Sequence, residues 1–457
     1  MLSDPIAALA TPPGRSALAV IRLSGTGALD IAARVVSGRG PLEAAGSHLA
    51  GIPDRVATLA VFRGPDGGAI DQGLVTIFRG PRSYTGEDLV ELSCHGGLLA
   101  PAELLAALHA AGARPAAPGE FTRRALLNGK LDLLQAEAIG DLIDASAPAQ
   151  GRAALHQLDG GLSRRIAGLR EQAVELLALL AYDIDFPEED DGPVPRGRIR
   201  SARDALSQQV DLLLATAPAG ERLREGALVV LAGRPNAGKS SLFNALLGVN
   251  RALVTEIPGT TRDTIEAHTA LLGWPVRLAD TAGLRESEEP IERLGIEVSR
   301  RYLGAADLVL LCVEAGRALT AEERQLQRDR RVVLIRSKAD LIPAGGGDGG
   351  EDEGLAVSAV TGLGLDAVAR GIAERLFDGR DASGDLTPML TRGRHRVSLE
   401  RAAAALGGAG HHMEGAGDPV LAAHHIQAAV AELDELIGLV HPDEVLGRVF
   451  ERFCVGK

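Results

Sequence analysis

The sequence is poor in aromatic residues and in cysteine, and both shortages exclude functions. Aromatic side chains make up only 3% of the 457 residues, which disfavours a surface that stacks the bases of single-stranded nucleic acid. The cysteines, Cys94, Cys312 and Cys454, lie far apart along the chain. This spacing excludes a CxxC zinc site and a disulfide framework.

Long apolar runs and an excess of basic residues are also missing. The longest apolar runs, such as "LVLLCV", fall well short of the roughly 18 residues of a membrane span. The first residues, "MLSDPIAALATPPGR", lack the basic and apolar regions of a secretory signal. The formal charge of −13 argues against a broad surface that coats nucleic acid. We therefore expect a soluble cytoplasmic protein without membrane contact, whose nucleic-acid contacts are local.

The pattern of apolar residues predicts a multidomain protein of α/β and all-α parts. Residues 1–118 mix β-like runs with Gly/Pro turns and one helix, which is typical of an α+β domain. Residues 119–220 have helical spacing, 221–378 alternate strands with helices as in a parallel sheet, and 379–457 are helical again. We therefore predict one helical domain, formed by two chain segments, with an α/β domain inserted into it.

The segment "ALVVLAGRPNAGKSSLFNALLG" predicts a phosphate-binding loop. An apolar strand leads into Gly233-x-x-x-x-Gly238-Lys239-Ser240, and an amphipathic helix follows. The glycines let backbone N–H groups surround a phosphate at the helix N-terminus. We expect Lys239 to reach the β- and γ-phosphates and Ser240 to bind magnesium.

Three later motifs predict that the nucleotide is GTP. Asp280-Thr281-Ala282-Gly283 follows a strand and offers a magnesium-shell carboxylate and a glycine N–H for the γ-phosphate. Ser337-Lys338-Ala339-Asp340 follows another strand, and the Asp340 carboxylate can accept both guanine N–H donors. Ser358-Ala359 follows the next, and Thr260 and Thr261 lie where a switch threonine is expected. The region therefore resembles a Ras-like P-loop GTPase.

Two positions depart from the Ras-like pattern. Ser337 replaces the usual Asn or Thr, and its shorter side chain is expected to weaken the link between the base-binding strand and the P-loop. Leu284 replaces the Gln that positions the attacking water. No arginine finger is evident, although Arg285 is near. Glu292 lies at the edge of a helical pattern from which it can approach the nucleotide, whereas we interpret its acidic neighbours as a solvated loop: Glu286, Glu288 and Glu289.

The chain as a whole resembles the MnmE (TrmE) family of tRNA-modification GTPases. The resemblance rests on "GRPNAGKSS", "TEIPGTTRD", "DTAGLRESEEPIERLGIE" and "FCVGK", and on "ATPPGRSALAVIRLSG", "GPRSYTGEDLVELSCHGG", "PGEFTRRALLNGKLDLLQAEAIGDLIDAS" and "DFPEED". It implies an N-terminal domain that dimerises and binds a folate one-carbon carrier. It also implies that the protein, with the flavoprotein MnmG, adds an aminomethyl-type group, such as carboxymethylaminomethyl, at C5 of the wobble uridine of certain tRNAs.

The resemblance also implies roles for single residues. Glu292 corresponds to the glutamate that orients water, and hydrolysis is expected to be stimulated by potassium through pairing of G domains. The implied potassium ligands are Asn236, Thr255, Ile257 and Thr260, and the implied magnesium ligands are Ser240 and Thr261. The implied contacts for 5-formyl- or 5,10-methylene-tetrahydrofolate are Arg22, Glu91, Lys130 and Lys457.

Motifs and resemblance together predict the residues that contact GTP. Asn236 also has a simpler explanation, because asparagine is common in turns. The predicted set is Asn236, Ala237, Gly238, Lys239, Ser240, Ser241, Thr255, Glu256, Ile257, Pro258, Gly259, Thr260, Thr261, Asp280, Thr281, Ala282, Gly283, Ser337, Lys338, Ala339, Asp340, Ser358, Ala359 and Val360.

Some features fit other interpretations. Arg22 and Glu91, taken alone, are ordinary surface residues of β-like runs, and Cys94 and His95 should point to opposite faces of a strand. "RGRHR" (392–396) is a local basic spot that is typical of a solvated helix face. The histidines of "GGAGHHMEGAGDP", expected to be a loop, and of the helix after it are interpreted as scattered surface residues: His411, His412, His424 and His425.

The terminal "CVGK" has the length of a prenylation box, but Gly456 and Lys457 do not suit one. We instead predict that Cys454 takes part in catalysis, as a thiolate that attacks C6 of the uridine or as an acid/base, with a plain helix end as the alternative. Two other functions stay open for the whole chain. One is a GTPase switch in ribosome assembly or at a membrane, and the other is a scaffold for the flavoprotein without chemistry of its own.

Overall fold

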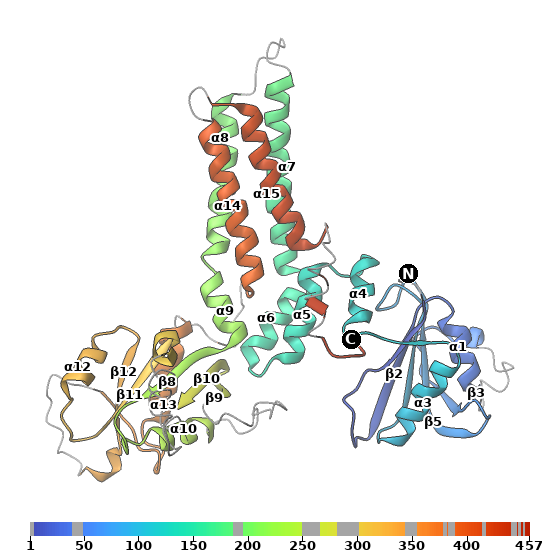
Figure 1. Cartoon of the computed structure of the whole chain (residues 1–457), viewed down its shortest axis with the longest axis horizontal. Helices are drawn as coiled ribbons and strands as arrows, with labels where there is room; N and C mark the ends of the chain where they lie inside the picture. The colour runs from blue at the N-terminus through green and yellow to red at the C-terminus, as the bar shows by residue number, and fades with distance from the viewer. Residues whose placement is uncertain are drawn as a thin grey trace, which may run out of the picture. The chain divides into compact units, whose positions relative to one another are not determined.

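The computed structural model forms two compact units (Figure 1). Unit 1 comprises residues 1–140 and 434–457, and unit 2 comprises residues 141–433. The residues that the structure describes are 4–38, 49–185, 195–248, 266–280, 301–342, 354–377, 382, 389–413, 417–439, 446, 449–450 and 453–457.

Unit 1 is built on a mixed sheet with the strand order β3-β4-β5-β6-β2-β1-β7 over the described residues. Helices α1 and α3 supply residues to the same apolar core as the strands (Figure 1). The elements are β1 (Ile6–Leu9), β2 (Leu18–Ser24), α1 (Ala28–Val35), β3 (Val36–Gly38), the 3₁₀ turn η1 (Leu49–Gly51), β4 (Thr58–Arg63), β5 (Ala69–Phe78), β6 (Leu89–His95), α3 (Leu99–Ala110), β7 (Arg114–Pro115), α4 (Glu120–Leu127) and α5 (Leu133–Asp144), which runs on into unit 2.

Alternation along β2 and β6 decides which side chains of this sheet stay accessible. Ile21 of β2 and Leu92 of β6 are fully buried in the core, whereas the residues next to them, Arg22 and Glu91, are only half-buried. The antiparallel register pairs Arg22 directly with Glu91. Two charged residues 69 positions apart in the sequence therefore become neighbours on the less covered face of the sheet.

The helical part of unit 2 comes from two separate stretches of the chain. Helices α7 and α8 of the first stretch lie beside α14 and α15 of the second (Figure 1). The elements are α6 (Pro148–Leu158), α7 (Gly161–Asp185), α8 (Arg196–Leu214), α9 (Ala217–Glu225), α14 (Gly393–Met413) and α15 (Pro419–Ile437).

The chain between α9 and α14 forms an α/β layer structure. Within the described ranges its sheet has the order β13-β12-β11-β8-β10-β9, and the β9–β10 pairing is the one antiparallel pairing among them. All of β8 and nearly all of β11 are buried, as expected for central parallel strands covered on both faces. The elements are β8 (Ala227–Ala232), α10 (Lys239–Gly248), β9 (Glu266–Leu271), β10 (Trp274–Asp280), β11 (Leu308–Glu314), α12 (Ala321–Gln327), β12 (Val332–Ser337), the 3₁₀ turn η4 (Ala339–Leu341), β13 (Leu355–Ala356) and α13 (Leu365–Phe377).

The prediction of a loop over "GGAGHHMEGAGDP" is wrong for its first part. Helix α14 continues to Met413, so His411 and His412 lie in its last turn. Glycine normally disfavours a helix, which is why the sequence predicted a loop, but tertiary context can override propensity. Gly410 lies against α8, where a Cβ on it would be 2.7 Å from the guanidinium of Arg203.

None of the helices in the described ranges combines the length and the apolar character that a membrane crossing requires.

Candidate functional site

The P-loop lies where β8 ends and α10 begins. Gly233 has a φ of +137°, and a Cβ on it would overlap the carbonyl oxygen of Cys312 on β11. Asn236, with a φ of +62°, and Gly238, with a φ of +82°, are also in the left-handed region. These residues turn the chain tightly between β8 and α10, as in loops that present backbone N–H groups to a phosphate.

Lys239 and Ser240 stand at the start of α10, as the sequence predicts. The Lys239 ammonium donates hydrogen bonds across the loop to the carbonyl oxygens of Gly233, at 3.0 Å, and Arg234, at 2.8 Å. The Ser240 hydroxyl donates to Oδ2 of Asp280, the last residue of β10, at 2.6 Å. A hydroxyl beside a carboxylate is an oxygen donor set that suits magnesium.

The base-binding motif is attached directly to the P-loop. The buried Ser337 hydroxyl donates to the carbonyl oxygen of Ala237 at 2.7 Å. The link that this serine was expected to weaken is therefore present as a hydrogen bond, and its expected loss of strength stays a prediction. A Cβ on Gly238 would lie 3.5 Å from the Cβ of Ser337, so the P-loop approaches the strand end closely enough for a serine.

The rest of the predicted guanine pocket lies at the same edge of the sheet. Lys338 is in the left-handed region and pairs with Glu314 at 3.5 Å, while Asp340 is exposed. The Ala339 N–H donates to the Val357 carbonyl at 3.1 Å, which joins this loop to the loop after β13.

In the loop after β13 the buried Ser358 hydroxyl accepts from the Thr361 N–H at 3.1 Å, with the exposed Val360 beside it. Ser241 follows Ser240 in α10, and Ala359 follows Ser358.

The remaining predicted nucleotide and metal residues lie outside the described residues. They are Thr255, Glu256, Ile257, Pro258, Gly259, Thr260, Thr261, Thr281, Ala282, Gly283 and Glu292. Their roles therefore stay predictions.

One contact of the P-loop was not anticipated from the sequence. Arg234 forms a two-pronged ion pair with Glu323 of α12, with both N···O distances 2.8 Å. Glu323 in turn completes a capping box with Thr320. The pattern Thr-x-x-Glu before a helix was visible in the sequence and signals this cap. The Arg234–Glu323 ion pair thus connects the P-loop to α12.

A second cluster in unit 1 gathers three of the four predicted folate contacts with the C-terminal tail, defined here as residues 453–457. Arg22 donates from Nε to Glu91 Oε1 at 2.9 Å and from Nη1 to the Gly456 carbonyl at 3.4 Å. Its guanidinium lies 5.5 Å from the ring centroid of Tyr84, within cation–π range. Burial lowers the pKa of Lys457; Arg22 adds to this effect, while Cys454 and Glu91 oppose it.

The fourth predicted folate residue has different contacts. The Lys130 ammonium donates to the carbonyl oxygen of Pro81 at 3.0 Å, and its side chain passes Gly86. Lys130, which lies between α4 and α5, therefore contacts the loop between β5 and β6, in the same unit as Arg22 and Glu91 but with other partners.

The three cysteines differ sharply in exposure. Burial raises the pKa of the Cys312 thiol to about 12 and also raises the pKa of Cys94, so both thiols are packing groups. Cys454 is exposed. As predicted, Cys94 is buried, whereas His95 is exposed and contacts Asp71 at 2.9 Å.

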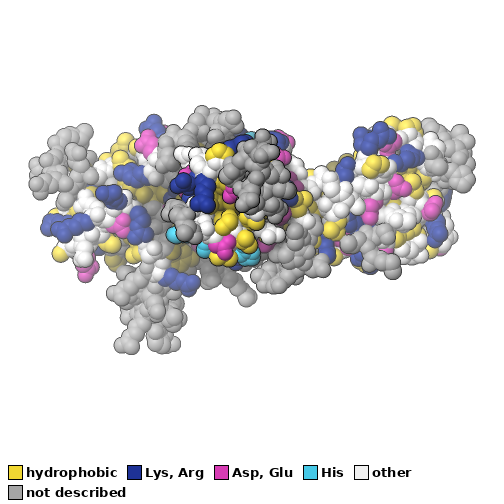
Figure 2. All heavy atoms as spheres, turned by 90° about the horizontal axis from the view of Figure 1, so that it is seen from above, with side chains coloured by type: hydrophobic (Ala, Val, Ile, Leu, Met, Phe, Trp, Pro, Cys, Tyr) yellow, Lys and Arg dark blue, Asp and Glu magenta, His cyan; other side chains and the backbone are white. Residues whose placement is uncertain are grey.

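On the face that Figure 2 presents, basic and acidic side chains are interspersed over the described residues.

Two family models match the chain. The model of the MnmE helical domain covers residues 133–454, and that of the N-terminus of the GTP-binding protein TrmE covers residues 5–130. The chain belongs to the MnmE family. The family resemblance and the multidomain fold class predicted from the sequence are thereby confirmed.

Relatives that match the chain over its full length support the assignment to the MnmE family. The tRNA modification GTPase MnmE of Moorella thermoacetica is 43% identical over 469 residues, which cover 100% of this chain and 100% of the relative. The protein of the same name from Thermus thermophilus is 44% identical over 457 residues, again with 100% of both chains covered. The solved G domain of the T. maritima FeoB iron transporter is 29% identical and covers 34% of this chain and 98% of its own, with a TM-score of 0.24.

Proposed function

We propose that the chain is a GTP-hydrolysing enzyme that modifies the wobble uridine of certain tRNAs. The observation that carries the proposal is the P-loop joined to Asp280 and Ser337 within a chain that matches tRNA modification GTPases over its full length. We further propose MnmG as flavoprotein partner, a homodimer and a cytoplasmic location. The proposed domain limits are 1–118, 119–220, 221–378 and 379–457.

In the proposed hydrolysis the P-loop binds the GTP phosphates. The Lys239 ammonium exchanges its two carbonyl partners for the β- and γ-phosphate oxygens, and Asp340 accepts the guanine N–H groups. Ser240 and Thr261 would hold magnesium, which when bound neutralises the charge that develops on the phosphates. Asn236, Thr255, Ile257 and Thr260 would hold potassium, and Glu292 orients the attacking water.

In the proposed modification the tail of unit 1 meets the folate one-carbon carrier. Arg22 and Glu91 form a ready ion pair beside the tail, and Lys457 is half-buried next to Arg22. An amine with a lowered pKa is neutral at a lower pH than usual, which suits proton transfer near the carrier. Lys130 is proposed as a further folate contact and Cys454 as the thiol that acts on the uridine.

Wobble-uridine nucleosides, measured by mass spectrometry, test the proposal. Cells that lack the protein should lose the modified nucleoside, and the wild-type chain should restore it. A variant with Cys454→Ser should not restore it, whereas Cys94→Ser should. Unchanged modification in the deleted cells would overturn the enzyme assignment and favour a GTPase switch in ribosome assembly or a scaffold.

Hydrolysis is tested separately with purified protein. Glu292→Ala should remove GTP turnover while GTP still binds, and sodium in place of potassium should slow turnover. Normal turnover by the variant would exclude Glu292 from the mechanism, and equal rates in both salts would exclude the potassium ligands.

A further inference from the structure

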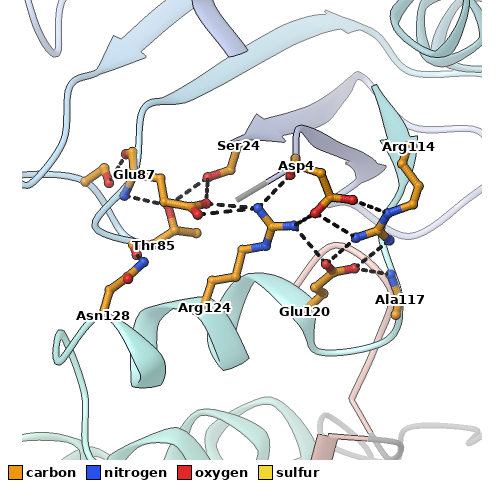
Figure 3. Close-up of polar contacts among 10 residues, drawn as sticks. Asp4, Ser24, Thr85, Glu87, Arg114, Ala117, Glu120, Arg124 and Asn128 are labelled. Carbon is orange, nitrogen blue, oxygen red and sulfur yellow. Dashed lines mark hydrogen bonds and ion pairs between the residues drawn. The ribbon is translucent and has the colours of Figure 1, made fainter. Parts of the chain in front are cut away.

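A network of charged side chains around the buried Arg124 and Glu120 lies at the start of α4, outside the residues assigned to either site (Figure 3). At its centre is Arg124, only 1% exposed. Its Nη1 donates to the Asp4 carbonyl at 2.8 Å and to Glu87 Oε2 at 3.1 Å. Its Nη2 donates to Asp4 Oδ1 at 3.0 Å and to Glu120 Oε1 at 2.9 Å. One guanidinium thus joins the N-terminal segment, the loop before β6 and α4.

Glu120 connects Arg124 to the chain segment immediately before α4. Its Oε2 accepts from the Ala117 N–H at 2.8 Å, and its Oε1 accepts from Arg114 at 2.7 Å (Figure 3). Burial alone would raise the pKa of Glu120, but the hydrogen bonds from Arg114, Ala117 and Arg124 lower it overall. Both oxygens of the carboxylate therefore accept hydrogen bonds, which tie the side chain to the turn at residues 117–120.

That turn holds the C-terminal tail through its backbone. The Gly119 N–H donates to the Cys454 carbonyl at 3.4 Å, and the Phe121 N–H donates to the Lys457 oxygen at 3.2 Å. Gly119 has a φ of +65°, and a Cβ on it would lie 2.9 Å from side-chain atoms of both Phe450 and Phe453. The first-turn N–H groups of a helix have no acceptor within the helix, so the tail satisfies donors that α4 cannot.

Stability alone does not account for such a network. A buried set of ion pairs gains little over well-packed apolar residues of the same volume, because desolvation offsets the attraction. What several hydrogen bonds on one guanidinium and one carboxylate do provide is a restricted geometry. Here that geometry is the one of the turn on which the tail rests.

We propose that Arg124 is a positioning residue that, through Glu120, sets the place of Cys454 and Lys457. The inference rests on the proposed function insofar as the tail carries the modification chemistry. Arg124 contacts the turn and not the reacting groups, so it acts only through the backbone that holds the tail.

Hydrogen exchange of the Phe121 amide in the full-length protein tests the proposal, because the acceptor of that amide is the tail. Arg124→Lys and Glu120→Gln should each speed its exchange about tenfold or more, while amides of β6 keep their rates. Arg63→Lys is the matched control: Arg63 is an exposed arginine of the same unit that bonds Ser37 and Gly67, and its loss should leave Phe121 protected. If Arg124→Lys fails to fold, the near-isosteric Glu120→Gln carries the test.

Two results would overturn the proposal. One is unchanged exchange at Phe121 in both variants, and the other is an equal rise in β6, which marks a general loss of structure. The variant with the larger rise in Phe121 exchange should also show the larger fall in the amount of modified nucleoside. If Cys454→Ser keeps normal modification while Phe121 exchange responds as expected, the proposed role of the tail fails and the positioning by Arg124 stands.

Discussion

At the scale of single residues, Ser337 shows how a short side chain can replace a longer one. Its hydroxyl reaches the Ala237 carbonyl at 2.7 Å, because the P-loop lies close to the end of β12. The sequence identifies the substitution but not the distance that the hydroxyl must span. The expectation of a weaker link was based on side-chain length alone, and the structure adds that the hydroxyl reaches its acceptor at 2.7 Å.

Ser337→Ala should therefore weaken nucleotide binding. The change removes one buried hydrogen bond and leaves the Ala237 carbonyl without this donor, at a cost of about 0.5–1.5 kcal/mol. If the whole cost appears in binding, the affinity for GDP falls about two- to tenfold, which titration with a fluorescent GDP analogue measures. Thr58→Ala removes a similar hydroxyl-to-carbonyl bond in unit 1 and should leave the affinity unchanged. Equal affinities of Ser337→Ala and wild type would show that the bond does not organise the site.

At the scale of elements, local motifs were predictable and long-range pairings were not. The P-loop is a continuous pattern of strand, turn and helix, so the sequence alone located Lys239 and Ser240 at the start of α10. The Arg22–Glu91 pair instead depends on the register between β2 and β6, which no local pattern encodes. Only family resemblance pointed to those two residues. The Arg124 network, spread over segments up to 120 residues apart, gave no signal in the sequence.

The stability of the turn before α4 should depend on pH, because carboxylates hold it in place. The pKa of Glu120 is lowered by its hydrogen bonds despite burial, and that of Asp4 is lowered first by the hydrogen bond from Arg114. Both groups release their protons more readily in the folded state than in the unfolded state. Their contribution to stability is therefore complete above the ordinary carboxyl pKa of about 4 and is lost as the pH falls through the lowered values.

Thermal unfolding from pH 7 down to pH 3 measures this contribution. Unit 1 of the wild type should lose stability steeply below about pH 4, and Glu120→Gln should flatten the loss because it removes one titrating group. Glu103→Gln, at an exposed position of α3, is the control and should follow the wild-type curve. A Glu120→Gln curve parallel to the wild type would contradict the assignment of the acid sensitivity to this turn.

At the scale of the whole molecule, the chain divides into two compact units, and each contains residues that can report on its unfolding. Trp274, the sole tryptophan of the sequence, is 3% exposed in the core of the α/β region and stacks on Phe377 at 4.3 Å. Cys454 is the exposed cysteine, while Cys94, in the core of unit 1, becomes reactive only on unfolding. Fluorescence therefore reports on unit 2, and slow thiol labelling of a Cys454→Ser variant reports on Cys94 in unit 1 and Cys312 in unit 2.

We expect two unfolding transitions that respond differently to GDP. A ligand that binds only the folded α/β region stabilises it by RT ln(1 + [L]/Kd), about 2.7 kcal/mol at a hundredfold excess over Kd. The tryptophan transition and the labelling of Cys312 should therefore shift to higher urea concentration together, whereas the labelling of Cys94 should not move. Mass spectrometry of labelled peptides distinguishes the two cysteines. An equal shift of Cys94 would mean that the units unfold as one, because stabilisation at the nucleotide site would then extend through both cores.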